Sequence, residues 1–415
     1  MGRAPALSES QKNSDLRSVR SDRVFDDGKP FGLHPVQYAT GVLPMHRRRA
    51  FLTQIPLGLA GLATACGETR RGDVTIAAAP AAGATAARPA PLLRDIPANA
   101  PTLRWTPEHR DLVYTFGGAP AKHRIAPGTR IVSWTEDCFD GLVKTASDLP
   151  SKAMPPGHDN PQTGPFYIEG AEPGDTIAVH LVKLEPARDY AVSSFGPGFG
   201  ALVGTDRTAM LAPDMPETTW RYAVDPSRSM ARASSGDGRY TWEVPLAPFL
   251  GCVGVAPAAS EVRSTIVPGP FGGNMDCPEV RAGNTVFLGV NVPGALLSFG
   301  DGHYAMGDGE IMGAAIEGAM NVELFVELVK RQATPVPRIE NADEVMFVGS
   351  GRPLEDAARV AFKAMVGWVR TRTGLSELDA YQFVSQVARA PIVQLVDPEY
   401  TVLVKIEKHR LPRRE

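Results

Sequence analysis

The stretch Thr176-Ile-Ala-Val-His-Leu-Val-Lys183 decides the fold class of this 415-residue chain, because it is a short apolar run that predicts a β-strand. The turn-forming sequence Glu169-Gly-Ala-Glu-Pro-Gly-Asp175 stands directly before it. Residues 129–134 (TRIVSW) alternate in the way that suits a half-buried strand, and residues 285–292 (TVFLGVNV) predict another. Together these runs predict packed antiparallel sheets in a β-sandwich-like arrangement.

The composition agrees with many short elements and excludes several classes of protein. The chain has 41 glycines and 37 prolines, which punctuate short strands and turns. Its hydrophobic fraction of 43% can build a large core, so the chain is not disordered. The net charge of −3 gives no sign of a nucleic-acid partner. Four cysteines are too few for a disulfide scaffold, and their spacing does not match a zinc site.

The C-terminal part has a different pattern that predicts two helices. In residues 354–368 apolar side chains recur at helical spacing, and Gly374 follows as a stop. Ser376 predicts the start of a second helix, which Pro391 ends, and residues 400–406 return to a strand. We therefore predict a β-rich α+β fold with a C-terminal helical pair that has a structural role.

An export signal is predicted near the start of the chain. Arg47-Arg48-Arg49-Ala50-Phe51-Leu52 contains the Arg-Arg-x-Phe-Leu pattern of the twin-arginine motif, which implies the twin-arginine export machinery as a partner. The weakly apolar segment that follows is too short to span a bilayer, and Ala63-Thr-Ala65 offers a cleavage site. In a second interpretation Cys66 is lipidated after cleavage. We expect a periplasmic or membrane-anchored envelope protein.

The chain thus divides into four predicted segments. Residues 1–44 form an extension, with Met45 as an alternative start, and residues 45–66 form the export signal. Residues 67–101 form an Ala/Pro-rich tether with little capacity to build a core, and residues 102–410 form the folded domain.

One glycine-rich window carries most of the candidate chemistry. It contains four acids and one histidine separated by glycines, namely Asp276, Asp301, His303, Asp308 and Glu310. Glycine allows the backbone to approach a ligand closely, and clustered acids repel one another unless they bind a cation, share protons or face water. Mixed histidine and carboxylate ligands suit Zn²⁺ or a similar divalent ion. The competing interpretation is a set of solvated turns, in which acid–glycine pairs are common.

Two weaker candidates lie outside this set. Asp137, in the run Thr135-Glu-Asp-Cys138, follows a predicted strand that can bring a carboxylate to the same site. Cys277 stands beside Asp276 and is a candidate nucleophile served by His303, although a reactive thiol needs a lowered pKa. A buried, inert cysteine is the alternative for Cys277.

Several motifs together resemble the acetamidase/formamidase family, over residues 102–408. They are Gly164-Pro-Phe-Tyr-Ile-Glu-Gly-Ala-Glu-Pro-Gly-Asp175, Gly-Val-Ala-Pro257, Gly-Gly-Asn-Met-Asp276, Gly-Asp-Gly-His303 and Gly-Asp308-Gly-Glu310. The resemblance implies a β-sandwich-rich fold, a homo-oligomer, and hydrolysis of short-chain linear amides to carboxylate and ammonia. It also implies that Asp137, Asp276, the acids of the glycine loop and Glu317 are site residues. Tyr304 and Met306 depart from the family's pattern and are predicted to reshape the pocket.

We therefore predict an exported amidase that acts on C–N bonds other than peptide bonds. Asp276 and His303 are predicted to hold a metal ion or to position water, and Glu310 is the candidate general base. The remaining predicted roles are catalytic for Asp137 and metal-ligating for Asp301 and Asp308. Two alternatives stay open: a non-catalytic envelope protein that binds Ca²⁺ or a small ligand through the acidic loop, and a cysteine amidase that uses Cys277.

Overall fold

A computed structural model of the chain describes residues 95–203 and 215–413. The predicted extension, the export signal, Cys66 and most of the tether lie outside the described residues. Within the described residues no helix is long and apolar enough to cross a membrane.

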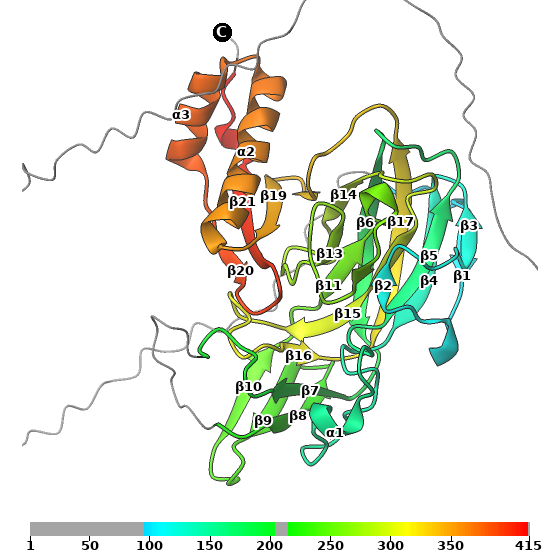
Figure 1. The fold of residues 1–415 in the computed structure, drawn as a ribbon, viewed down its shortest axis with the longest axis vertical. Helices are drawn as coiled ribbons and strands as arrows, with labels where there is room; N and C mark the ends of the chain where they lie inside the picture. The colour runs from blue at the N-terminus through cyan, green and yellow to red at the C-terminus, as the bar shows by residue number, and fades with distance from the viewer. Residues whose placement is uncertain (1–94, 204–214, 414–415) are drawn as a thin grey trace, which may run out of the picture. The chain divides into compact units, whose positions relative to one another are not determined.

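The first large sheet confirms the strands predicted from apolar runs. Its strand order is β1-β4-β17-β6-β14-β18-β19-β21-β20, and all its pairs are antiparallel except β1 with β4. The strands are β1 (Thr102–Arg104), β4 (Thr129–Thr135), β6 (Thr176–Pro186), β14 (Thr285–Gly289), β17 (Met320–Val329), β18 (Arg338–Glu340), β19 (Glu344–Gly351), β20 (Ile392–Gln394) and β21 (Tyr400–Glu407). The apolar run 176–183 forms most of β6, which lies between β17 and β14 (Figure 1).

The second large sheet contains the strands that carry the candidate site. Its main path is β10-β9-β8-β7-β16-β15-β11-β13, and β5 joins it through β15 and carries β3. The strands are β3 (His123–Ile125), β5 (Gln162–Ile168), β7 (Tyr190–Phe195), β8 (Thr218–Asp225), β9 (Met230–Ser234), β10 (Thr241–Pro245), β11 (Phe249–Gly254), β13 (Gly272–Asn274), β15 (Leu297–Ala305) and β16 (Ile316–Glu317). A separate two-stranded ribbon pairs β2 (Thr115–Phe116) with β12 (Arg263–Ser264).

One hydrophobic core joins the two sheets, as the sandwich-like prediction requires. Val179 and Leu181 of the first sheet belong to the same buried cluster as Phe166, Leu250 and Phe299 of the second. The rings of Phe166 and Phe299 stack with centroids 5.8 Å apart. Burial of such side chains stabilises the fold by about 1.5–3 kcal/mol each. Every residue of β15 is buried, so polar residues on this strand are held in a rigid environment.

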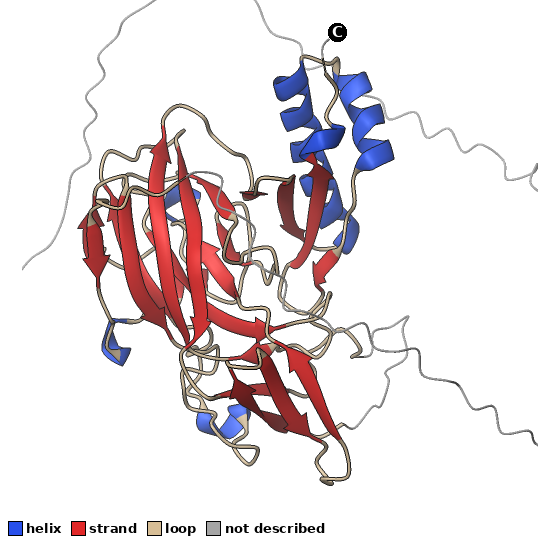
Figure 2. Cartoon of the chain, turned by 180° about the vertical axis from the view of Figure 1, so that it is seen from behind, coloured by secondary structure: helices blue, strands red, loops and turns tan. Residues whose placement is uncertain are grey.

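The predicted C-terminal helical pair is also present. Helix α2 (Leu354–Thr373) ends at Gly374, whose φ of 79° is the left-handed conformation that glycine adopts most easily. Helix α3 (Glu377–Val387) begins after Ser376, whose hydroxyl accepts a hydrogen bond from the Asp379 amide. Both helices pack on a second apolar cluster with strands β19 and β21, and Figure 2 shows the two helices side by side. The remaining helical segments are short: α1 (Pro150–Ala153) and the 3₁₀ turns η1 (His109–Asp111), η2 (Ala258–Ser260) and η3 (Lys408–Arg410).

Candidate active site

Strand β15 brings His303 into register with an acid on the neighbouring strand. His303 pairs with Phe249 of β11 on one side and with Glu317 of β16 on the other. The strand can pack this closely because residue 302 is a glycine, where a β-carbon would lie 2.4 Å from the carbonyl oxygen of Gly318. The ring of Phe249 meets the imidazole edge to face at 4.7 Å and covers one of its sides.

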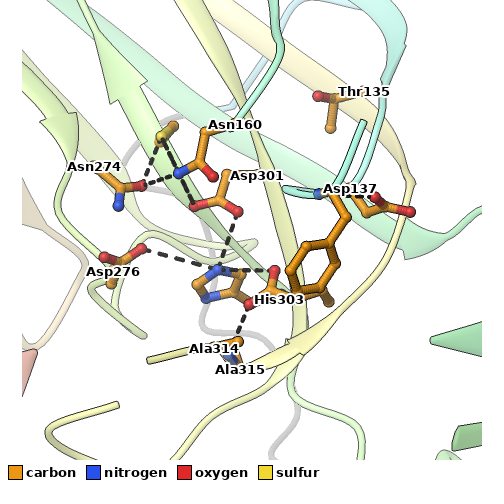
Figure 3. Close-up of polar contacts among 12 residues, drawn as sticks. Thr135, Asp137, Asn160, Asn274, Asp276, Asp301, His303, Ala314 and Ala315 are labelled. Atoms are coloured by element: carbon orange, nitrogen blue, oxygen red, sulfur yellow. Dashed lines mark hydrogen bonds and ion pairs between the residues drawn. The ribbon is translucent and has the colours of Figure 1, made fainter. Parts of the chain in front are cut away.

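The Nε2 atom of His303 faces three carboxylates. It lies 3.3 Å from Asp301 Oδ1, 3.3 Å from Glu317 Oε2 and 3.9 Å from Asp276 Oδ1. All four side chains are at most 2% exposed. Figure 3 shows both Asp276 and Asp301 directed at the imidazole. Asp301 lies on β15, and Asp276 lies in the loop after β13.

Two further acids complete the cluster. A carboxylate oxygen of Glu310 lies within 4.8 Å of ligand atoms of His303 and Glu317, and one lies within 4.8 Å of ligand atoms of Asp276 and Asp397. Glu310 lies in the loop after β15, whereas Asp397 lies between β20 and β21, and both are buried. The Cys138 thiol approaches Asp301 and Glu317 from the loop after β4. Side chains from distant parts of the sequence therefore converge on one buried point.

Three of the acids hold a strained backbone conformation. The φ angle is 45° at Asp276, 59° at Asp301 and 45° at Glu310, which is the left-handed region that residues other than glycine rarely adopt. Such positions cost about 1–3 kcal/mol each and are retained where the surrounding structure requires them, often at functional sites. At Asp301 the β11–β15 ladder skips one pair, since Leu250 pairs with Gly302 and Cys252 pairs with Gly300.

A hydrogen-bond network behind the acids fixes their positions. Asn274 Nδ2 donates to Asp397 Oδ2 at 2.7 Å, and its Oδ1 accepts from Cys252 Sγ at 2.8 Å and from Asn160 Nδ2 at 2.9 Å. Asn160 Nδ2 also lies 3.3 Å from Asp301 Oδ2. Amide and thiol groups therefore orient two of the carboxylates without neutralising their charge.

Burial and mutual repulsion disfavour the charged forms of these acids. Burial raises the pKa of Glu317 to about 8 and the pKa of Asp397 to about 8, and it raises the pKa values of Asp276 and Glu310 well above the usual range. Burial acts against protonation of His303, but the carboxylates of Glu317 and Asp301 outweigh it and raise the histidine pKa. Without a cation, these raised pKa values favour the protonated forms of the buried acids.

The residues present fit a divalent metal ion. Both oxygens of Asp276, Oδ1 of Asp301 and Oε2 of Glu317 are buried and have no hydrogen-bond donor among the described residues. Two ligands at about 2.0–2.2 Å from a tetrahedral zinc ion lie roughly 3.3–3.5 Å from each other. The two distances of 3.3 Å at His303 Nε2 match this separation. A donor set of one imidazole and several carboxylates suits zinc or another first-row divalent ion.

The cluster forms the polar side of a cavity of about 330 Å³. The polar lining includes Asn160, Asn274, Asp276, Asp301, His303, Glu310, Glu317 and Asp397. The apolar lining includes Phe139, Pro150, Met154, Phe199 and Ile266. The space is in the range of small-molecule binding sites in enzymes.

The structure brings together five of the predicted site residues and leaves two apart. The five that line the cavity are Asp276, Asp301, His303, Glu310 and Glu317. Asp308 is exposed and belongs to no group of ligand-forming side chains in the described part of the chain.

Asp137 does not join the cluster either. Its carboxylate accepts a hydrogen bond of 2.9 Å from Arg188 Nη1, and Figure 3 shows it away from the imidazole. Burial and the neighbouring Glu136 raise the pKa of Asp137 to about 7. The residues that line the cavity from this loop are Cys138 and Phe139, which follow Asp137 in the chain.

Three residues to which sequence reasoning assigned a role do not line this cavity: Cys277, Tyr304 and Met306. The Cys277 thiol donates to Glu279 Oε2 at 3.4 Å and does not line the cavity. Burial raises its pKa well above the usual range, which is the opposite of what a nucleophile needs. Tyr304 is buried, with its hydroxyl donating to the Ala319 carbonyl, and neither Tyr304 nor Met306 lines the cavity.

Sequence reasoning missed Asn160 and Asp397, and it gave Asn274 no role. Asn274 lies in the Gly-Gly-Asn-Met-Asp276 motif, so its position beside a site acid was a usable signal. Asp397 is followed by Pro398, a pair typical of an ordinary turn, and it carried no signal that separates it from one.

The comparisons with known proteins now define the class. A solved structure of acetamidase from Yersinia enterocolitica is 36% identical, has a TM-score of 0.69, and is matched over 76% of this chain and 94% of its own length. An acetamidase structure from Bacillus halodurans is 29% identical with a TM-score of 0.66, over 74% of this chain and 98% of its own. The β-rich α+β fold predicted from the sequence is therefore shared with acetamidases.

The family assignment follows from the chain's sequence. The model of the acetamidase/formamidase family matches residues 116–262 and 250–401, and the chain belongs to this family. An acetamidase of Mycolicibacterium smegmatis is 26% identical over 261 residues, and the match spans 51% of this chain and 64% of that protein. Family membership confirms the predicted resemblance and supports an amidase, whereas nothing in these comparisons supports a non-catalytic binding protein.

Proposed function

We propose that the protein hydrolyses primary amides of short carboxylic acids to the carboxylate and ammonia. The observation that carries the proposal is the buried group of five carboxylates and one imidazole on one side of a cavity, in a member of the acetamidase/formamidase family. The substrates in the names of its relatives are small neutral amides, which have no charge to oppose this negative surface.

Asp276, Asp301 and His303 are the residues that we assign to a divalent metal ion, with Glu317 as a further ligand. The assignment rests on the convergence of these side chains at His303 Nε2 and on their unpartnered buried oxygens. A divalent ion there would act as a Lewis acid that polarises an amide carbonyl and lowers the pKa of a water molecule. Asp137 and Asp308 are left out of this assignment because they lie apart from the cluster.

Glu310 is the group that we assign to proton transfer. Amide hydrolysis takes a proton from the attacking water and delivers one to the departing nitrogen, which a single carboxyl can do in turn. Glu310 lines the cavity, and burial together with the nearby Asp276 raises its pKa well above the usual range. A group that holds its proton more tightly than an exposed glutamate is suited to protonate a leaving amine near neutral pH.

The test is ammonia release from a panel of primary amides by purified protein supplied with divalent metal. Wild type should release ammonia, and Glu310→Gln should lose at least about a hundredfold in kcat. The matched control is Glu340→Gln, since Glu340 is a partly buried glutamate of β18 outside the cavity lining. Absence of ammonia release from every amide would refute the amidase, and an unimpaired Glu310→Gln would remove that residue from its role.

Export and assembly remain proposals that rest on the sequence. The Arg-Arg-x-Phe-Leu pattern at residues 48–52 supports twin-arginine export to the cell envelope, with lipidation of Cys66 as the alternative form of anchoring. Fractionation of cells that carry the wild-type chain or a variant with Arg48 and Arg49 changed to lysine tests both, because only an exported form should reach the envelope. The homo-oligomer is tested by light scattering of the purified protein.

A further inference from the structure

We infer that the preferred substrate is a primary amide whose acyl group is an uncharged hydrocarbon of about four to six carbons, larger than formamide or acetamide. The inference rests on the proposed amidase function and concerns the apolar side of the same cavity. Since a primary amide has no substituent on nitrogen, its acyl group is the only part that can occupy that side.

The first step is the size of the cavity. At roughly 30 Å³ for each non-hydrogen atom, the share of one water molecule in the liquid, a space of 330 Å³ holds about eleven atoms. Acetamide has four such atoms, and a metal ion with one water molecule takes the place of about two more. Space for at most about five further atoms is left, so an acyl group of up to about seven carbons fits, whereas an acetyl or formyl group cannot fill the space.

The second step is the chemistry of the apolar part of the lining. Phe139 and Met154 belong to one apolar cluster with Val192, which anchors this wall to strand β7. Phe199 rests on Gly313, where a β-carbon would lie only 2.5 Å from the phenylalanine ring. Ordered hydrocarbon side chains of this kind gain stability by burying an apolar ligand.

The third step is the connection between Phe199 and Glu310 through one loop. Gly313 lines the cavity and donates its amide hydrogen to the carbonyl of Glu310 at 2.8 Å, so the loop under Phe199 is the loop that carries the proposed proton donor. A molecule with its amide at the acids therefore directs its acyl chain toward Phe199 and Met154.

Charge excludes anionic acyl groups. The described residues that line the cavity include six carboxyl side chains and one imidazole, but no lysine or arginine. A carboxylate at the far end of the acyl group would lose its water shell among apolar side chains and would find no lysine or arginine there to pair with. An amide of a dicarboxylic acid is therefore expected to be a poor substrate.

The experiment measures kcat/KM for ammonia release along the series formamide, acetamide, propanamide, butanamide, pentanamide, hexanamide and octanamide, with succinamate as the anionic member. Each methylene that enters an apolar site should raise kcat/KM by about fourfold. The value should peak at pentanamide or hexanamide, fall for octanamide, and be at least about tenfold lower for succinamate than for butanamide.

Two variants of one wall residue test the location. Met154→Trp should reduce kcat/KM for hexanamide by at least about tenfold with less than about a threefold change for acetamide, and Met154→Ala should move the optimum to longer chains. Met230→Trp is the matched control, because Met230 is a partly buried methionine of β9 outside the cavity lining, and its chain-length profile should equal that of wild type.

The outcomes separate the inference from the proposed function. Hydrolysis that is fastest with formamide or acetamide, or a profile that Met154→Trp and Met230→Trp change equally, would overturn the inference and leave the amidase intact. If no amide releases ammonia, both are refuted.

Discussion

Gly251 of strand β11 lies directly against the carboxylate of Asp301. A β-carbon at position 251 would stand 2.3 Å from Asp301 Oδ2 and 2.6 Å from Asp276 Oδ1, closer than real β-carbons approach other atoms. The main chain also binds the second acid, since the Gly251 carbonyl accepts a hydrogen bond from the Asp276 amide at 3.2 Å. The missing side chain at Gly251 therefore leaves room for the carboxylates of both Asp301 and Asp276.

The first prediction is that Gly251→Ala disrupts the site more than the fold. The added methyl must push both carboxylates away from His303, so metal affinity should fall about ten- to hundredfold, with stability lowered by about 1–3 kcal/mol. Metal content after dialysis, urea unfolding and kcat/KM measure these effects. Gly236→Ala is the control, because a β-carbon there has no atom within 4 Å. Normal metal content in Gly251→Ala would contradict the close approach.

The second prediction concerns Asn274, whose side chain amide connects Asp397 to the rest of the network. Asn274→Asp keeps the shape but removes the hydrogen that Nδ2 donates to Asp397, and it adds a carboxylate beside five others. We expect kcat/KM to fall about ten- to hundredfold and the metal-free protein to lose about 1–3 kcal/mol. Asn291→Asp, at a partly buried asparagine that donates to the Ala256 carbonyl outside the cavity, should keep wild-type activity. Equal effects of both changes would count against an orienting role.

The third prediction gives Asp137 a structural role. Arg188 donates to Asp137 Oδ2 at 2.9 Å and to Glu136 Oε2 at 2.7 Å, and both acids are buried. Arg188→Met leaves them without a cation and should destabilise the protein by about 3–5 kcal/mol. Arg228→Met, which breaks an exposed pair with Glu243, should change stability little. If Arg188→Met unfolds no more easily than Arg228→Met, the buried ion pair does not stabilise the fold.

Local pattern was sufficient to predict most of the fold. Residues 129–134 and 176–183 became β4 and β6, and Gly374 and Ser376 bound the two helices as predicted. These features depend on neighbours in sequence: periodicity for strands and helices, and the φ preference of glycine or a hydroxyl cap for helix ends. The pairing of β15 with both β11 and β5 depends on partners far along the chain, and no local pattern specified it.

The candidate site could be predicted only where its residues are close in sequence. Asp276, Asp301, His303 and Glu310 fall in one glycine-rich window, whereas Asp397 reaches the cluster from beyond both helices. Asp308 stands two residues from Glu310, but it is exposed and lies outside the cluster of ligand-forming side chains. Asp137 and Cys138 are neighbours, and of these two only Cys138 lines the cavity. Which of two neighbours points inward is set by packing.

The fourth prediction is that stability depends on pH in opposite directions in the metal-free protein and in the contribution of bound metal. In the metal-free fold the pKa of Asp397 and of Glu317 is raised to about 8, against about 4 in an unfolded chain. Between these values the folded state binds more protons than the unfolded state, so stability is greatest near pH 4 to 5 and falls as the pH rises toward 8. Metal binding requires deprotonated ligands, so the stabilisation that Zn²⁺ provides should instead increase over the same range.

Urea unfolding at pH 5, 6, 7 and 8, with chelator or with Zn²⁺, measures both slopes. Asp397→Asn supplies the matched variant: its side chain has no proton to lose, so the fall in metal-free stability from pH 5 to 8 should be smaller than in wild type. Asp148 does not produce this signal, because hydrogen bonds from the Lys144 and Thr145 amides lower its pKa. Metal-free stability that rises from pH 5 to 8 would show that the buried acids are already compensated by something other than protons.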